Sequence, residues 1–134
     1  MKLWFNQYLI SDDKSLLDFT AIKGFLAQSY WGNHRSEDTV TRSIQHSLCY
    51  GVYDNSKQIG FARVVTDFAT MYWLCDVFID EAYRGQGIGK RLVEAIITSD
   101  ELKGIMGVLG TKDAHELYEQ YGFTRDQERI MRRK

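Results

Sequence analysis

Three alternate glycines lie between an apolar segment and an amphipathic one, and this pattern constrains the fold more than any other feature of the chain. They are Gly85, Gly87 and Gly89, within the stretch 80–91. The preceding residues 71–79 are apolar over the length of a strand, and the residues after the glycines place apolar side chains at helical spacing. Glycine lets the backbone curl and present successive N–H groups, and the following helix adds the positive end of its dipole. The stretch therefore predicts a strand, an anion-binding loop for a phosphate or pyrophosphate, and a helix.

Two well-known phosphate loops do not fit this spacing. A Walker loop would place a glycine at position 84 and Ser or Thr after Gly89-Lys90, but the chain has arginine at positions 84 and 91. The dinucleotide fingerprint requires a glycine three residues after its second one, where this chain has Lys90. The pattern that remains is Arg84-x-x-Gly87-x-Gly89.

This pattern resembles the Gln/Arg-x-x-Gly-x-Gly/Ala sequence that carries the pyrophosphate of coenzyme A in the GCN5-related N-acetyltransferase (GNAT) superfamily. A second block, residues 113–123, resembles the family's later helix, where Leu-Tyr is followed by Gly-Phe. In this block we expect Asp113 to cap the helix, Glu116 to complete a capping box and Gly122 to end the helix. A tight strand-to-helix turn alone would explain the glycines, but the two blocks together favour the acyltransferase fold.

The resemblance covers nearly the whole chain and implies an α/β (α+β) fold. It predicts a mixed, mostly antiparallel sheet of about six or seven strands with one parallel, splayed pair, flanked by about four helices. In chain order the pattern predicts a strand over 3–10, helices over 15–30 and from Ser36, strands over 49–53, 58–66 and 71–79, a helix after the glycines, a strand over 104–110, the capped helix and a last strand near Ile130.

Composition adds limits to this interpretation. The 134 residues are 44% hydrophobic with a formal net charge of −1, and they predict one domain over 1–134. The overall charge does not favour binding to nucleic acid or to a membrane surface. No apolar run is long enough to cross a bilayer, and the start lacks a signal peptide. We therefore expect a cytoplasmic protein. Cys49 and Cys75 are interpreted as buried thiols, and the three histidines are too scattered for a metal site.

The resemblance implies acetyl-CoA as the acyl donor, bound where two parallel strands diverge. Backbone groups of Val77, Phe78 and Ile79 would pair with its pantetheine arm, although an ordinary buried strand explains their side chains equally well. The pyrophosphate would be wrapped by Arg84, Gly85, Gln86, Gly87, Ile88, Gly89 and Lys90. For Lys90 and Arg91, a position on a solvated helix face explains the positive charge as well as direct contact with the pyrophosphate does. Thr111 stands where many relatives carry Asn, and would bind the pantetheine less firmly or through water.

Two residues are candidates for catalysis. Tyr118 occupies the position of the family's general acid, which would protonate the departing thiolate, and the alternative is a core tyrosine. Asp76 is an acid in an apolar strand, and strict alternation would point it away from Cys75 and Val77. It is either a general base, direct or through water, or the ion-pair partner of a structural arginine such as Arg63. Solvent is the other candidate base, and the backbone N–H of Val77 is a candidate oxyanion donor.

The acceptor pocket is expected to have aromatic walls formed by Tyr30, Trp31, Tyr72 and Trp73. We expect a primary amine of a small molecule as the acceptor, with protein lysines and N-termini as alternatives. A non-catalytic acyl-CoA-binding module remains a second interpretation. Nucleic-acid binding would depend only on the basic residues 129–134, which a solvated tail explains better. A homodimer is left open.

Overall fold

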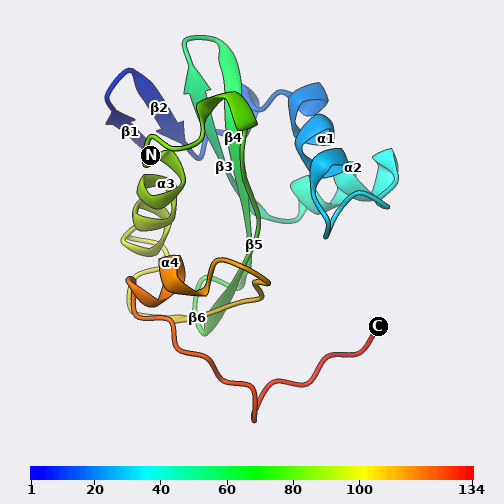
Figure 1. Cartoon of the computed structure of the whole chain (residues 1–134), viewed down its shortest axis with the longest axis vertical. Helices are drawn as coiled ribbons and strands as arrows, with labels where there is room; N and C mark the ends of the chain where they lie inside the picture. Colours follow the sequence, from blue (N-terminus) through cyan, green and yellow to red (C-terminus); the bar gives the residue numbers. More distant parts are fainter.

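A six-stranded mixed sheet forms the centre of the protein (Figure 1). The computed structural model describes all 134 residues. The strands follow one another across the sheet in chain order: β1 Lys2–Phe5, β2 Tyr8–Ser11, β3 Leu48–Asp54, β4 Lys57–Thr66, β5 Met71–Ile79 and β6 Met106–Leu109. Neighbouring strands are antiparallel except for β5 and β6, which are parallel. The mixed sheet with one parallel pair confirms the predicted fold class.

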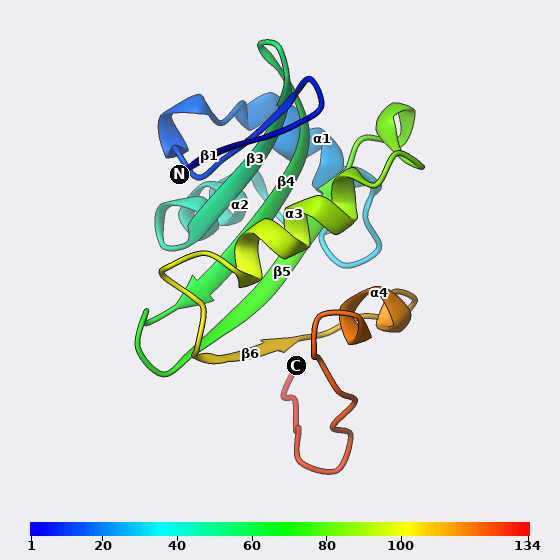
Figure 2. The same cartoon turned by 90° about the vertical axis from the view of Figure 1, so that its left-hand side faces the viewer.

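Four α-helices cover the two faces of this sheet. They are α1 Phe19–Gln28, α2 Glu37–Gln45, α3 Ile88–Ile97 and α4 His115–Glu119, with short 3-10 turns at Lys14–Leu16 and Glu81–Tyr83. In Figure 1, α1 and α2 lie on one side of the sheet and α3 lies on the other. Figure 2 shows α3 crossing the strands, with α4 beside β6. None of these helices has the length and apolar character of a membrane span.

Each face of the sheet has its own apolar core. The core under α3 includes Leu92, Val93 and Ile96 from the helix, and it extends to Leu74 on β5 and Tyr118 on α4. The core on the opposite face joins α1 and α2 to the sheet through Ile22, Leu26, Val40, Ile44, Phe61 and Phe78. The helical spacing of these apolar residues in the sequence is what allows each helix to bury one side.

The parallel strands β5 and β6 diverge part-way along their length. Four residue pairs join them, from Met71↔Met106 to Leu74↔Leu109. β5 then continues to Ile79 without a partner on that edge, whereas β6 ends at Leu109. We call this region of divergence the splay. On this edge the backbone groups of 75–79 have no strand partner and can pair with an extended ligand, except the carbonyl of Ile79, which accepts a hydrogen bond from Arg84.

Two predicted elements at the ends of the chain differ in the structure. Residues 3–10 were expected to form one strand, but the chain turns at Asn6, whose φ is 53°, and forms the β1–β2 hairpin. The two polar turn residues, Asn6 and Gln7, separate apolar residues on both sides. The last strand predicted near Ile130 is wrong, because residues 124–134 contain no strand and extend away from the sheet.

Of the two predicted side-chain caps, the one at α2 forms and the one at α4 does not. Ser36 caps α2 as expected, since its Oγ accepts a hydrogen bond from the N–H of Thr39 at 3.2 Å. The capping box of Asp113 and Glu116 is wrong. α4 begins after Ala114 without a side-chain cap, and the N–H of Ala114 instead donates to Oγ1 of Thr111 at 3.0 Å.

Candidate active site

The glycine loop joins the end of β5 to α3 and presents free backbone donors. Gly85 and Gly87 have φ values of 82° and 83°, which an L-residue adopts only with strain. Gly87 is the N-cap of α3, and the N–H of Arg91 makes the first bond of the helix, to the carbonyl of Gly87 at 3.0 Å. The N–H groups between them, including that of Gly89, therefore precede the helical hydrogen bonds. The predicted anion site has the required backbone geometry.

Side chains fix this loop to the rest of the sheet. Oε1 of Gln86 accepts a hydrogen bond from the hydroxyl of Tyr8, on β2, at 2.9 Å. Nε of Arg84 donates to the carbonyl of Ile79 at 2.9 Å, and its guanidinium lies 4.9 Å from the ring centroid of Phe78. Arg84 is thus held at the end of β5, beside the glycines, and its terminal nitrogens make no hydrogen bond to protein. Such an arginine suits a phosphate oxygen.

A β-bulge interrupts β5 at Asp76. The β4–β5 register passes from Phe61↔Phe78 to Arg63↔Cys75, so β5 carries one more residue than β4 between these pairs. Asp76 has a φ of 54°, which is unusual for a residue other than glycine. The bulge breaks the strict alternation expected from the sequence, and Cys75 and Asp76 both lie close to Arg63. Burial raises the pKa of the Cys75 thiol to about 11.

The Asp76 carboxylate is buried and has three hydrogen-bond donors. Its side chain is only 1% exposed. Oδ2 accepts from Nη1 of Arg35 and from Nε of Arg63, both at 2.8 Å, and Oδ1 accepts from Nε1 of Trp31 at 2.9 Å. Burial alone would lower the pKa of Arg63, but its hydrogen bond to Asp76 raises the pKa overall. This is the structural-arginine alternative that the sequence left open, with Arg35 as a partner that no local pattern indicated.

Tyr118 lies on α4 in the same apolar core as Leu74, the last β5 residue to pair with β6. Burial raises the pKa of Tyr118, and the neighbouring Tyr30 and Asp113 raise it further. The phenol therefore stays protonated at neutral pH, as a general acid requires. Oγ1 of Thr111 accepts the Ala114 hydrogen bond at the start of α4. Its own hydroxyl proton remains available to a ligand in the splay.

The four expected acceptor-site aromatics differ in exposure and in contacts. Tyr30 and Trp31 follow α1 and meet edge to face, with their ring centroids 5.0 Å apart. Trp73 is 38% exposed. Tyr72 is buried in the core under α3, where its ring lies over Gly107. The structure therefore places Tyr72 away from the other three.

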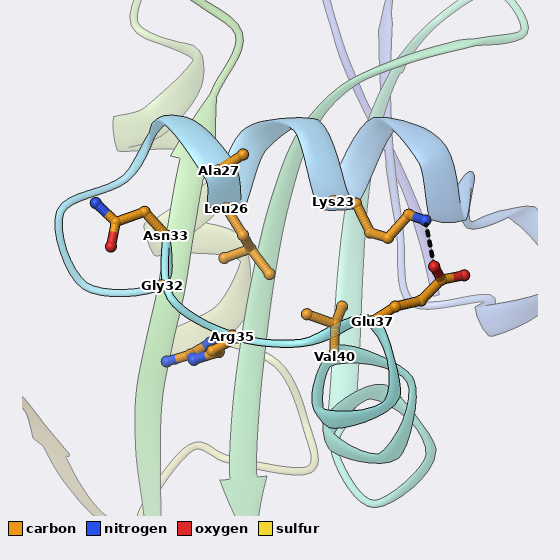
Figure 3. A pocket seen from close by; sticks show the side chains of 8 residues that line it. All are labelled: Lys23, Leu26, Ala27, Gly32, Asn33, Arg35, Glu37 and Val40. Carbon is orange, nitrogen blue, oxygen red and sulfur yellow. Dashed lines mark ion pairs between the residues drawn. The ribbon is translucent and has the colours of Figure 1, made fainter.

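A small hollow opens between α1, α2 and the loop that joins them (Figure 3). Its volume is about 70 Å³, and the ion pair of Lys23 with Glu37, at 3.1 Å, lies at one end of it. It is lined by Lys23, Leu26, Ala27, Gly32, Asn33, Arg35, Glu37 and Val40. A space of this size holds little more than water. Arg35, which also lines this hollow, donates its hydrogen bond to Asp76 on the sheet.

Comparison with known proteins agrees with this geometry. Residues 45–125 match the family model described as the acetyltransferase (GNAT) domain. The chain belongs to the GNAT family. A protein of Xanthomonas campestris assigned to this family is 38% identical, and its crystal structure covers 98% of this chain and 95% of its own with a TM-score of 0.91. The matched span 45–125 contains the glycine loop, β5, β6 and Tyr118.

Curated GNAT relatives are more distant and longer. A Gibberella zeae protein assigned as an acetyltransferase is 26% identical over 117 residues, which cover 72% of this chain and 65% of the relative. Histone acetyltransferase TAP1 of Glycine max is 34% identical over 79 residues, covering 58% of this chain and 34% of that protein. The chain thus spans between a third and two thirds of these relatives. No group of three or more metal-ligating side chains occurs in the structure.

Proposed function

We propose that this protein transfers the acetyl group of acetyl-CoA to a primary amine, most simply that of a small molecule. One observation supports this above all: the free N-terminus of α3 follows the unpaired edge of β5 after Leu74, and Tyr118 packs in the same core as Leu74 and Ile88. The residues present fit coenzyme A. Gly87 leaves room for a phosphate beside the N–H groups of α3, and Arg84 adds a positive charge.

The binding roles follow from where each group lies. The loop from Arg84 to Lys90 would hold the pyrophosphate, and backbone groups of 77–79 would pair with the pantetheine arm as an added strand. Thr111 would contribute its hydroxyl near the end of this arm. These groups orient the thioester relative to Tyr118 and the acceptor, which is a large part of what an acyltransferase must do.

The chemical step assigns separate roles to the protein groups. The backbone N–H of Val77 would donate to the carbonyl oxygen as it gains negative charge. As the amine forms its C–N bond and the C–S bond breaks, Tyr118 would give its proton to the departing thiolate and regain one from solvent. The ammonium proton of the acceptor would pass to water, because the Asp76 carboxylate already has three donors.

The acceptor would enter on the side of Tyr30, Trp31 and Trp73. Their rings suit a cationic amine, because the faces of aromatic rings attract positive charge. A protein lysine is the second candidate acceptor, and the name of the Glycine max relative is the observation that favours it. We propose the cytoplasm as the location.

An amine panel tests the proposal. The assay follows free thiol released from acetyl-CoA, with small amines, amino acids, lysine peptides and peptide N-termini in separate wells. We expect release above the hydrolytic background with at least one small amine. Coenzyme A binding without release for any amine would instead indicate the non-catalytic acyl-CoA-binding module, and no binding of coenzyme A would overturn both interpretations. Calorimetry distinguishes these two outcomes.

A further inference from the structure

The loop between α1 and α2 is attached to the bulge in β5. We define residues 29–36 as the acceptor loop. Two of its side chains, Trp31 and Arg35, bind the two different carboxylate oxygens of Asp76. Arg63 on β4 holds Oδ2 from the other side, and its Nη1 donates to Oγ of Ser47 at 3.1 Å. The carboxylate is therefore clamped between the sheet and the acceptor loop.

The acceptor loop also contacts the far side of the splay through Tyr30. The hydroxyl oxygen of Tyr30 accepts a hydrogen bond from the backbone N–H of Lys112 at 3.3 Å. Nζ of Lys112 lies 5.4 Å from the centroid of the Tyr30 ring. Lys112 follows β6, whereas Asp76 lies on β5. A continuous chain of contacts thus runs from Asp76 through Trp31 and Tyr30 to the segment after β6.

This chain of contacts ends in the segment that leads into α4. Lys112 lies two residues before Ala114, whose carbonyl accepts a hydrogen bond from the N–H of Tyr118, the candidate general acid, at 3.3 Å. Tyr30 is also among the groups that raise the pKa of Tyr118. Tyr30 is 54% exposed, so packing alone holds it loosely. Its position depends on Trp31, whose ring it meets edge to face, and on the bond to Lys112.

We propose that Asp76 is a positioning residue that fixes Trp31 and thereby holds Tyr30 across the acceptor side of the splay, near Tyr118. The inference rests on the proposed acetyl transfer, because it assigns a role in shaping the acceptor site of that reaction. The cost of a buried carboxylate and of a positive φ at Asp76 is consistent with such a role, since strained residues persist where the surroundings fix them.

A comparison of two variants separates positioning from proton transfer. Asp76→Asn keeps the shape and removes the charge, while Trp31→Phe replaces the indole with a smaller aromatic ring that has no donor and leaves Asp76 in place. For a positioning role we expect both variants to lower kcat/KM for the acceptor by about tenfold or more, with the KM for acetyl-CoA little changed. The double variant should lose no more than Asp76→Asn alone, since both break one chain of contacts. The pH profile should keep its shape in each.

Trp4→Phe is the matched control, because Trp4 lies on β1, is 65% exposed and has no part in the site. It should keep wild-type kinetics. The inference is overturned if Trp31→Phe behaves like wild type while Asp76→Asn changes the pH profile, because Asp76 would then be the base. It is also overturned if neither variant changes acceptor kinetics.

A second measurement does not depend on catalysis. In the wild type, the Trp31 indole N–H bonded to Asp76 should exchange slowly with D₂O, with the exposed Trp4 indole as the fast reference. Asp76→Asn should speed the exchange of Trp31 and leave Trp4 unchanged. Unaltered Trp31 exchange would overturn the inference. Wild-type protein that shows this protection but releases no thiol with any amine would contradict the proposed function and leave the Asp76–Trp31 coupling established.

Discussion

The hydroxyl of Tyr8 donates a hydrogen bond to Oε1 of Gln86 at 2.9 Å, and so ties the N-terminal hairpin to the glycine loop across 78 residues of sequence. Tyr8 is buried on β2, and its ring meets that of Tyr83 edge to face with centroids 6.0 Å apart. The loop is thus held on its outer side by a strand that does not contact the splay. We expect the shape of the anion site to depend on this distant contact.

We expect Tyr8→Phe to weaken coenzyme A binding by about twofold to tenfold, the usual effect of one hydrogen bond. The ring remains, so the fold should be retained, and calorimetry gives the dissociation constant. Gln86→Leu removes the same bond from the other side. If the two changes act through this bond, the double variant loses less than the sum of the single ones. Full additivity would show that Tyr8 and Gln86 act separately.

Gly87 and Gly89 offer a matched pair in the anion site. Gly87 has a φ of 83°, whereas Gly89 has ordinary helical backbone, and a Cβ there would lie 3.6 Å from Cγ1 of Ile79, an ordinary contact. Gly87→Ala should therefore cost about 1 kcal/mol of stability and weaken coenzyme A binding, while Gly89→Ala should be tolerated by the fold. Thermal unfolding and calorimetry measure the two effects. Equal melting temperatures for both variants would contradict the conformational argument.

The sequence correctly predicted the elements that depend only on neighbouring residues. Ser36 was identified as the cap of α2, and the glycine loop with α3 was placed correctly, because each depends on neighbouring residues. The parallel pair was inferred from the family resemblance, and the register of β5 with β6 confirms it. The predicted strands over 49–53 and 58–66 also form, as β3 and β4.

The features that the sequence did not predict depend on residues far apart in the chain. The bulge at Asp76 arises from the register between β4 and β5, and nothing in 71–79 marks an extra residue. The partners of Asp76 come from Trp31, Arg35 and Arg63, so its environment appears only once three elements have packed together. The last strand near Ile130 was wrong because an apolar pair in a basic tail satisfies the local pattern but has no strand to pair with.

Tyr118→Phe tests the general acid by removing only the hydroxyl. We expect turnover to fall by about a hundredfold or more, with the affinity for acetyl-CoA little changed. Because burial raises the pKa of Tyr118, loss of its proton should reduce the activity of the wild type only at a higher pH than that at which a free phenol ionises. Tyr121→Phe is the control, since the Tyr121 hydroxyl only donates to the carbonyl of Lys90 at 3.3 Å. A Tyr118→Phe enzyme as active as the control would make Tyr118 a core residue.

We expect the buried hydroxyl of Tyr53 to lower the free energy of unfolding at alkaline pH. Its hydroxyl is buried without a hydrogen-bond partner, and burial raises the pKa of Tyr53 from 10.0 to about 12. Between these values the unfolded chain loses the phenolic proton while the folded protein keeps it. The unfolded state then binds fewer protons, so the free energy of unfolding falls as the pH rises. Melting temperatures measured from pH 8 upward should therefore fall more steeply for wild type than for Tyr53→Phe.

At neutral pH the same substitution should be neutral or stabilising, because it removes a buried hydroxyl whose hydrogen bond to water was lost on folding. Tyr83→Phe should have the opposite effect at neutral pH, since the Tyr83 hydroxyl donates to Oδ2 of Asp54 at 3.0 Å and this bond stabilises the end of the β3–β4 hairpin. Cys49 is also buried with its pKa raised to about 11, and it is present in wild type and in both variants. The difference between wild type and Tyr53→Phe therefore reports the ionisation of Tyr53 together with its coupling to Cys49, which also raises the pKa of Tyr53. Parallel curves for the two would show that the Tyr53 phenol ionises no later in the folded protein than in the unfolded chain.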